Sequence, residues 1–225
     1  MSGPALAIMA RAPVPGQVKT RLQPHLTPEQ SADLALAFLK DALELAASVR
    51  AYAPFLAFTP TDMEAFFRQL VPSSVGLLAQ SEGDLGQKMY SIFQQLRDRG
   101  YSSIVVVGSD IPTLQPYHLE KTIEYLHDCE VCLGPSRDGG YYLIGAQGAH
   151  GCLFENIPWS TSSVLQNTIE RAKTAGLSLA LLEVCSDVDT VDDLRRLRLE
   201  LERLGQTPGA KVPRHTEACL KDISL

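Results

Sequence analysis

The sequence has no apolar run long enough to cross a membrane and no excess of positive charge. A transmembrane helix needs about 20 consecutive apolar residues, and no stretch of the 225 residues approaches that length. The apolar segment 5–10 is too short for a secretory signal and has no basic residue before it. With 20 Lys and Arg against 26 Asp and Glu, the net charge of −6 argues against binding to nucleic-acid backbones. We therefore expect a cytoplasmic protein that binds neither a membrane nor nucleic acid.

Cysteine is scarce and shows no pairing pattern. The five cysteines are an odd number without the spacing of a small disulfide-linked scaffold, so we expect free thiols. Cys129 and Cys132 form one C-x-x-C motif, but no second pair completes a zinc site. The motif also leads into an expected strand instead of opening a helix as a redox motif does. The cysteines therefore predict neither a metal centre nor redox activity.

Motifs of several common enzyme classes are also absent. There is no G-x-G-x-x-G, and Gly16 is separated from Lys19-Thr20, so neither a dinucleotide-binding fingerprint nor a Walker A loop is present. No G-x-S-x-G marks a serine hydrolase, and none of the five histidines belongs to a recognisable triad. Asp187 to Val191 fits the D-x-D-x-V pattern of aspartyl-phosphate phosphatases, but that pattern should follow the first strand. We therefore expect neither serine-type hydrolysis nor phosphatase chemistry.

What the sequence does contain is a regular alternation of strand and helix patterns. Apolar runs predict strands at 5–10, 55–58, 75–79, 104–107, 131–134, 141–146 and 177–184. Periodic apolar spacing and cap residues predict helices at 27–45, 62–70, 85–99, 116–127, 161–175 and 190–204. This alternation predicts one α/β domain over residues 1–204, with a mostly parallel sheet covered on both faces. Residues 205–225 contain two prolines and no clear periodicity, so we expect an arm or a flexible tail.

Carboxylates stand at two expected turns. The buried run 104–107 ends at Asp110, and the last expected strand is followed by Asp187 and Asp189. In open α/β sheets ligands bind at the carboxyl ends of the strands, and Mg²⁺ is held by one or two carboxylates together with substrate phosphates. Asp187 and Asp189 are two residues apart in an extended segment, so both side chains can point the same way. These three residues are candidate ligands for Mg²⁺ or Mn²⁺; the alternative for Asp110 is an Asx turn or a helix cap.

The loop after the first expected strand is basic. No acidic residue precedes Glu29, while Arg11, Lys19 and Arg21 supply positive charge close to several backbone amides. Such a loop can attract a polyphosphate, and Arg can contact it in bidentate fashion. The alternative is an ordinary solvated loop. Lys19 and Arg21 are our candidates to stabilise charge on a phosphate leaving group.

Two glycines at an expected helix start add a second candidate contact. Gly83 and Gly86 could present backbone amides to a ligand. Helix capping alone explains Asp84 between them.

The segment Asp138-Gly139-Gly140-Tyr141 places two glycines beside a carboxylate. Glycine permits positive φ and close approach of the backbone to a ligand, so these four residues are candidates for an acceptor site, with Asp138 as a base or acceptor ligand. A plain Asp-Gly hairpin turn between two strands explains Asp138 and Gly139 almost as well. Trp159 is a candidate to stack on a base or sugar ring, and a core position is the equal alternative.

Six segments occur in a characteristic order along the chain. They are 18–22 (Val-Lys-Thr-Arg-Leu), 83–86 (Gly-Asp-Leu-Gly), 108–112 (Gly-Ser-Asp-Ile-Pro), 134–141, 158–161 (Pro-Trp-Ser-Thr) and 187–190 (Asp-Val-Asp-Thr). In this combination, and over almost the whole chain to about Leu204, the sequence resembles a bacterial family of uncharacterised glycosyltransferase-like proteins. That family is labelled as a domain of unknown function or as selenodomain-associated transferases, within the nucleotide-diphospho-sugar transferase (GT-A) superfamily.

The resemblance implies a three-layer, Rossmann-like α/β/α sandwich in which a nucleotide lies against the first strand and its loop. A divalent cation, Mg²⁺ or Mn²⁺, would bridge protein carboxylates to the diphosphate, with Asp110 as the metal-binding acid of the superfamily and Asp189, with Asp187, as the second acidic site. One departure is that the usual Asp-x-Asp is reduced to Ser109-Asp110. The residues that would contact the nucleotide are Arg11, Lys19, Arg21, Gly83, Gly86 and Ser109. Those that would act in catalysis are Lys19, Arg21 and Asp138.

The implied function is a metal-dependent transfer from a nucleotide-activated donor. Glycosyl transfer from a nucleotide-diphospho-sugar comes first, because the resemblance covers nearly the whole chain. The Lys-Thr-Arg-Leu loop is also similar to phospholactate guanylyltransferases and molybdopterin nucleotidyltransferases, so nucleotidyl transfer from a nucleoside triphosphate with release of pyrophosphate is the alternative. A non-catalytic nucleotide-binding module is a third. The partners would be a nucleotide sugar or nucleoside triphosphate and a small-molecule acceptor, while the base, the sugar, the acceptor and the oligomeric state stay open.

Overall fold

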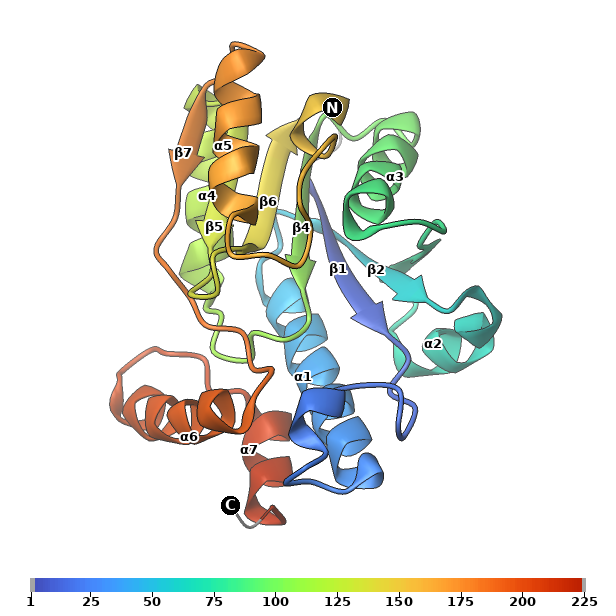
Figure 1. Ribbon diagram of the computed structural model, residues 1–225, viewed down its shortest axis with the longest axis vertical. Helices are drawn as coiled ribbons and strands as arrows, with labels where there is room; N and C mark the ends of the chain where they lie inside the picture. Colours follow the sequence, from blue (N-terminus) through green and yellow to red (C-terminus); the bar gives the residue numbers. More distant parts are fainter. Residues whose placement is uncertain (1–2, 224–225) are drawn as a thin grey trace.

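The structure is a computed structural model in which residues 3–223 are described. Among these residues, seven strands form one sheet in the order β3-β2-β1-β4-β6-β5-β7, with helices packed on both faces (Figure 1). The strands are β1 (Ala5–Arg11), β2 (Ala53–Thr59), β3 (Gly76–Ala79), β4 (Ser103–Gly108), β5 (Val131–Pro135), β6 (Tyr141–Gln147) and β7 (Leu179–Leu181). The helices are α1 (Pro28–Ser48), α2 (Glu64–Leu70), α3 (Leu85–Asp98), α4 (Pro116–Asp128), α5 (Val164–Thr174), α6 (Val191–Gln206) and α7 (Arg214–Lys221). The predicted three-layer α/β/α sandwich is confirmed.

The sheet is parallel except at β6. Parallel pairs join β1 to β2 and β4, β2 to β3, and β5 to β7, whereas β6 runs antiparallel to both β4 and β5. The connection between β5 and β6 spans only residues 136–140, and a parallel return would need a crossover of about a dozen residues or more. The mostly parallel sheet is therefore confirmed. Asp138 and Gly139 lie in a hairpin turn, which is one of the two interpretations that the sequence leaves open.

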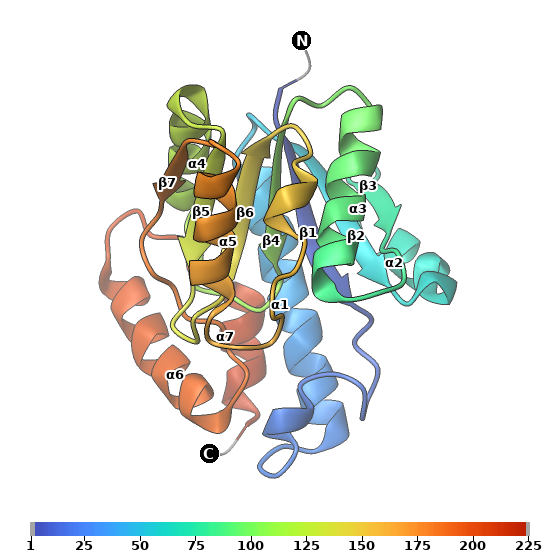
Figure 2. The same cartoon turned by 45° about the horizontal axis from the view of Figure 1, so that its top comes forward.

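Side chains along the strands alternate between two apolar layers. In β1, Leu6 and Ile8 belong to the layer covered by α1, α2 and α4, while Ala5 and Ala7 belong to the layer covered by α3 and α5. In β4, residues 104–107 are all buried, which explains their unbroken apolar run, because both faces of the strand are covered. The parallel strands β1 to β4 end at the same edge of the sheet, where the loops with the candidate residues begin (Figure 2).

Capping boxes begin three of the helices. Thr27, Asp84 and Thr190 each accept a hydrogen bond from the backbone three residues later and begin α1, α3 and α6. The starts at Thr27 and Thr190 agree with the sequence pattern. Asp84 is explained by its capping contact, the alternative that the sequence leaves open.

The chain beyond Leu204 differs from the expected arm or flexible tail. Helix α6 continues to Gln206, and α7 packs along α1 (Figure 1). Leu220 and Ile223 join an apolar cluster that includes Phe38 of α1. The eight residues of α7 are too few for their periodicity to be recognised. Their apolar face is covered by residues that are distant in the sequence.

The cysteines are free thiols. All five are unpaired, and Cys132 is buried in β5. Burial raises the pKa of the Cys132 thiol to about 12, so it is not a reactive thiolate at neutral pH. None of the helices among residues 3–223 is long and apolar enough to span a bilayer.

Candidate functional site

Three loops from distant parts of the chain meet at the carboxyl edge of the sheet. The loop after β1 brings Lys19, the turn after β4 brings Asp110, and the segment between β7 and α6 brings Asp189. The ammonium nitrogen of Lys19 lies 2.9 Å from Oδ2 of Asp110 and 2.9 Å from Oδ1 of Asp189. It also donates a hydrogen bond of 2.7 Å to the backbone oxygen of Val188. The basic loop and the two acidic turns therefore converge at one point, which we call the Lys19 cluster (Lys19, Asp110 and Asp189).

Backbone hydrogen bonds hold the two acidic turns together. The N–H of Val188 donates to the backbone oxygen of Asp110 at 3.1 Å. Asp193, the third residue of α6, accepts hydrogen bonds from the backbone N–H groups of Asp189 and Thr190, and Thr190 is the cap of the helix. Because Thr190 and Asp193 form the capping box, the carboxylate of Asp189 is left to face Lys19.

Lys19 is deeply buried and fully paired. Its side chain is 5% exposed, whereas the side chain of Asp110 is 43% exposed. Burial by itself would lower the pKa of Lys19, but the carboxylates of Asp110 and Asp189 raise it above its ordinary value. An ammonium group has three hydrogens to donate, and three acceptors surround this one. Lys19 was predicted as a phosphate contact, and in this structure it is the counter-ion of two predicted metal ligands.

A first pocket of about 360 Å³ opens beside the Lys19 cluster, between the loop after β1, the ends of β2 and β3, and α1. The charged and polar residues that line it are Arg11, Gln17, Lys19, Thr20, Arg21, Thr59, Gln80, Ser109, Asp110 and Asp189. The three predicted cations and Ser109 are thus brought together. Arg21 is open to solvent and also contacts the cluster. Its side chain is 74% exposed, and its Nη1 lies 3.8 Å from Oδ2 of Asp189.

A second pocket of about 540 Å³ lies on the other side of the cluster, against β4, β6, the β5–β6 turn and residues 159–162. Among the predicted site residues, it is lined by Asp138, Gly140, Tyr141, Trp159 and Asp187. The residues that line both pockets are Met9, Arg21, Ser109, Asp110 and Asp189. A ligand that occupies both pockets would therefore pass the carboxylates of the Lys19 cluster.

The second pocket is strongly acidic. Asp110, Asp138, Asp187 and Asp189 line it, and Arg21 is the one cationic side chain among the described residues that do so. Burial raises the pKa of Asp187 to about 6, and the neighbouring carboxylates of Asp138 and Asp189 add to this effect. Asp138 is partly committed to the hairpin, because its Oδ1 accepts a 2.9 Å hydrogen bond from the N–H of Gly140.

The glycines predicted at the site support the protein's own packing. Gly139 has φ 90°, as the pattern predicts. A Cβ there would collide with the backbone of Ser162, so the close approach is to another part of the chain and not to a ligand. A Cβ on Gly86 would lie 2.5 Å from the ring of Trp159, so this glycine lets Trp159 rest on the start of α3. Gly83, with φ 109°, and Gly86 line neither of the two pockets. We therefore do not place these two among the nucleotide contacts.

Gln80 is a pocket residue that the sequence patterns do not single out. It follows β3 directly and lines the first pocket. The available signal was a polar residue at the carboxyl end of a strand, the place where ligands bind in such sheets.

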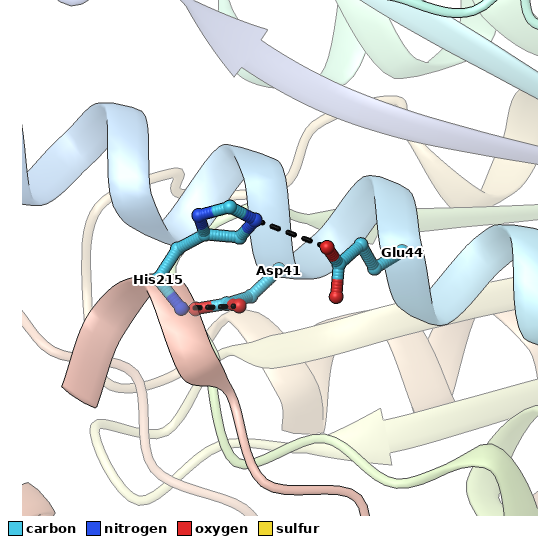
Figure 3. Close-up of side chains that lie close together, drawn as sticks. All are labelled: Asp41, Glu44 and His215. Atoms are coloured by element: carbon cyan, nitrogen blue, oxygen red, sulfur yellow. Dashed lines mark hydrogen bonds and ion pairs between the residues drawn. The ribbon is translucent and has the colours of Figure 1, made fainter. Parts of the chain in front are cut away.

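A further group of ligating side chains lies away from both pockets. Among residues 3–223, Asp41, Glu44 and His215 bring their ligand atoms within 4.8 Å of one another. Figure 3 shows His215 turned toward Glu44, with Asp41 beside the backbone of α7. Both oxygens of Asp41 already accept hydrogen bonds, from the N–H of His215 at 3.1 Å and from the N–H of Thr216 at 2.8 Å. This cluster is therefore explained by the attachment of α7 to α1.

Solved structures share this fold. A proposed nucleotide-diphospho-sugar transferase from Desulfovibrio desulfuricans is similar with a TM-score of 0.87 and 29% identity over 100% of both chains. CMP:2-keto-3-deoxy-manno-octonic acid synthetase in complex with CTP has a TM-score of 0.58 and 15% identity, over 90% of this chain and 99% of its own. The Mycobacterium tuberculosis protein Rv0371c in complex with manganese has a TM-score of 0.53 and 17% identity, over 87% and 97%. The chain thus has the fold of the nucleotide-diphospho-sugar transferases, and the last two likenesses show the fold alone.

The sequence also matches a protein family. No curated protein matches the chain. Residues 42–161 match the family described as "Uncharacterized protein conserved in bacteria (DUF2064)". The matched span includes Asp110, Asp138 and Trp159. The resemblance inferred from the motifs is confirmed, and the chain belongs to the DUF2064 family of uncharacterized bacterial proteins.

Proposed function

We propose that this protein is a metal-dependent transferase that uses a nucleotide-activated donor, and that it transfers a glycosyl group from a nucleotide-diphospho-sugar. The observation that carries the proposal is that two pockets meet at the carboxylates of the Lys19 cluster. A donor of this kind has two unlike halves joined by a diphosphate. The likeness in fold to a proposed nucleotide-diphospho-sugar transferase supports the same assignment.

The first pocket is the proposed nucleotide side. Arg11, Lys19 and Arg21 line it, and clustered positive charge attracts a diphosphate. Arg21 is exposed and can turn toward a phosphate for a bidentate contact. Ser109 adds a hydroxyl at the boundary of the two pockets.

The carboxylates of the Lys19 cluster fit a divalent cation. Oxygens of Asp110 and Asp189 both lie 2.9 Å from a single point, the nitrogen of Lys19, and carboxylate oxygens are what Mg²⁺ and Mn²⁺ bind. Asp187, in the second pocket, would be the third ligand. The cation, when bound, would stabilise negative charge on the diphosphate leaving group. When no cation is bound, Lys19 keeps the carboxylates of Asp110 and Asp189 from repelling each other. Lys19 and Arg21 also add positive charge of their own next to the diphosphate.

The second pocket is the proposed sugar and acceptor side. With Asp110, Asp187 and Asp189 assigned to the cation, Asp138 is the carboxylate of this pocket that is left to face an acceptor. Trp159 and Tyr141 offer aromatic surface, with ring centroids 6.4 Å apart, on which a sugar ring can stack. Asp138 is the proposed base or acceptor ligand. The aromatic surface of this pocket and the likeness to a proposed nucleotide-diphospho-sugar transferase favour glycosyl transfer over nucleotidyl transfer.

Two alternatives have their own support. Nucleotidyl transfer with release of pyrophosphate is the alternative favoured by the fold that the chain shares with a synthetase bound to CTP. A non-catalytic nucleotide-binding module is favoured by Gly108, which stands where the superfamily's Asp-x-Asp pattern has its first acidic residue, and by the full pairing of Lys19.

Product analysis separates the three. The protein would be incubated with a panel of nucleoside triphosphates and nucleotide sugars in Mn²⁺ or Mg²⁺. Release of nucleoside diphosphate supports the proposal, release of pyrophosphate supports nucleotidyl transfer, and binding without turnover supports the module. Asp110→Asn should reduce metal-dependent binding and turnover, while Asp98→Asn, an exposed carboxylate at the end of α3, should change neither. Failure of every nucleotide to bind would refute all three.

A further inference from the structure

The second pocket has a charged side and an uncharged side. The charged side chains that line it, among residues 3–223, are Arg21, Asp110, Asp138, Asp187 and Asp189. The start of α3 and the segment 159–164 contribute only uncharged residues, which we call the uncharged wall. They are Leu85, Met89, Trp159, Ser160, Thr161, Ser162 and Val164. Asp84 and Lys88 belong to the same part of α3 but do not line the pocket.

The large side chains of the uncharged wall form a continuous surface. Leu85 is the first residue of α3, and Gly86 beside it lets the indole ring of Trp159 rest on the helix. The ring of Trp159 meets that of Tyr141 nearly at right angles, with centroids 6.4 Å apart. The hydroxyl of Tyr141 in turn lies 4.0 Å from the sulfur of Met89. The wall therefore offers aliphatic, aromatic and thioether groups side by side.

This surface is open to a ligand at Leu85, which is 46% exposed. A single exposed leucine is ordinary on a protein surface. This one, however, lines a pocket together with the sole tryptophan of the chain and with Met9 and Met89, two of its four methionines. Methionine and aromatic side chains adapt well to apolar ligands. The uncharged wall thus fits an apolar group better than a second polyhydroxylated one.

We propose that the acceptor of the glycosyl group is an alcohol or phenol with an apolar body, of the size of a hexyl or phenyl group, that packs on the uncharged wall. This inference rests on the proposed function, because it takes the second pocket as the acceptor side. The hydroxyl oxygen of the acceptor bonds to the anomeric carbon of the sugar. The bond from that carbon to the diphosphate breaks, and its electron pair leaves with the nucleoside diphosphate. The hydroxyl proton passes to Asp138.

Simple alcohols test the proposal on the wild-type protein in Mg²⁺ buffer. Butan-1-ol, hexan-1-ol and hexane-1,2,6-triol are titrated, and the fluorescence of Trp159 reports binding at the wall. Each buried methylene group strengthens binding about 4-fold, so hexan-1-ol should bind about 10-fold more tightly than butan-1-ol and more tightly than the triol. Calorimetry with 4-ethylphenol then shows whether an aromatic or an aliphatic body is preferred. Equal affinities for hexan-1-ol and the triol would overturn the inference.

A substitution assigns the preference to the uncharged wall. Leu85→Ser removes the exposed apolar side chain and should weaken hexan-1-ol binding about 5-fold or more, with little effect on the triol. Leu199→Ser is the matched control, because Leu199 is 56% exposed on α6 and lines neither pocket. It should leave both affinities unchanged. An unchanged affinity for hexan-1-ol in Leu85→Ser would also overturn the inference.

A parallel assay separates this inference from the function on which it rests. Release of nucleoside diphosphate from nucleotide sugars is measured with hexan-1-ol or the triol as acceptor. If no nucleotide sugar binds, the proposed function fails and this inference falls with it. If nucleoside diphosphate is released as fast with the triol as with hexan-1-ol, the proposed function stands and the assigned acceptor class is wrong.

Discussion

The ammonium group of Lys19 lies 2.9 Å from Oδ2 of Asp110, with its side chain only 5% exposed while that of Asp110 is 43% exposed. The cation of this ion pair is buried and the acid is open to solvent. Asp189 contacts the same nitrogen at 2.9 Å. One lysine therefore pairs with two carboxylates that belong to turns from different parts of the chain. Lys19 therefore holds the two turns together at the edge of the sheet. Its ammonium group also occupies the point on which the two carboxylates converge.

Replacing Lys19 with Met should destabilise the protein. Two carboxylates would lose their common counter-ion, and we expect the free energy of unfolding to fall by about 1 to 3 kcal/mol in urea denaturation at pH 7.5. The raised pKa of Lys19 means that its contribution is complete below the unfolded pKa and is lost only as the pH rises through the folded value. The loss should therefore be the same at pH 7 and pH 9. Arg21→Met, which removes an exposed cation 3.8 Å from Asp189, should cost less than about 0.5 kcal/mol.

The same substitution should strengthen metal binding in the absence of nucleotide. In the wild-type protein a cation must compete with the Lys19 ammonium for Asp110 and Asp189. In Lys19→Met the two acids lose their shared ammonium group and only Arg21, 3.8 Å from Asp189, stays close, so the site attracts a divalent ion more strongly. We expect Mn²⁺ to bind about 10-fold more tightly or better, measured by electron paramagnetic resonance of free Mn²⁺. Identical Mn²⁺ affinities in the two proteins would show that the metal does not use these carboxylates.

Asp187 should limit stability at neutral pH. Its pKa is raised from 3.8 to about 6, so the folded state disfavours the charged form, and stability falls as the pH rises from the unfolded to the folded value. Asp187→Asn removes that penalty. We expect a gain of about 1 to 2 kcal/mol at pH 7.5, because partial exposure reduces the full effect of the shift, and no gain at pH 3.5. Thermal melts at both pH values test this, with Asp98→Asn as an exposed control. A gain that persists at pH 3.5 would point to a cause other than charge.

The positions of the acidic turns could be predicted because sheet topology alone determines them. Asp110 follows a strand whose unbroken apolar run marks it as central, and Asp189 follows the last strand pattern, so both must emerge at the ligand-binding edge. The pairing of Lys19 with them could not be predicted in the same way. It depends on a left-handed backbone at Lys19, φ 48°, in a loop without periodicity. Charge counting finds such a residue but does not give the direction of its side chain.

Other features that the sequence could not give also depend on contacts between distant parts of the chain. Gly139 and Gly140 predicted that the backbone approaches a ligand closely. Gly139 does have φ 90°, but its close neighbour is the backbone of Ser162. A positive φ can be inferred from a local pattern, whereas the identity of the neighbour cannot. The same holds for α7, whose cap residue Asp41 lies 175 positions before Thr216. Only the folded chain shows that eight residues near the C-terminus have a partner in α1.

Adding a methyl group at Gly86 should move Trp159. A Cβ at this position would lie 2.5 to 2.6 Å from three atoms of the indole ring, so Gly86→Ala must displace the ring or the start of α3. Trp159 is the sole tryptophan of the chain, and its fluorescence reports the displacement directly. We expect a shifted emission maximum and a loss of about 1 to 3 kcal/mol in stability. Gly205→Ala is the matched control. With no atom within 4 Å of its Cβ, it should stabilise α6 by up to about 0.5 kcal/mol and leave the fluorescence unchanged.

Asp41 should hold the C-terminal helix in place. This carboxylate is 5% exposed, and its oxygens accept hydrogen bonds from the N–H groups of His215 and Thr216 and from the hydroxyl of Thr216. Asp41→Ala should cost about 2 to 3 kcal/mol, because it leaves the start of α7 uncapped and a buried hydroxyl unpaired. Hydrogen exchange should then accelerate at the amides of α7 while those of β4 stay slow. Asp98→Ala, which removes an exposed carboxylate at the end of α3, should change neither.

The same hydrogen bonds predict how the cluster of Asp41, Glu44 and His215 responds to metal removal. Because both Asp41 oxygens are occupied by α7, attachment of the helix should need no cation. The melting temperature of the wild-type protein and the exchange rates of α7 should therefore be unchanged by EDTA. If EDTA released α7 as Asp41→Ala does, and added Zn²⁺ or Mn²⁺ restored it, the cluster would be a structural metal site and its explanation as a helix cap would be wrong.

Glu44→Gln adds a second criterion. The 3.0 Å contact between Glu44 and the His215 ring is exposed, so its loss should cost less than about 1 kcal/mol if no metal is held there.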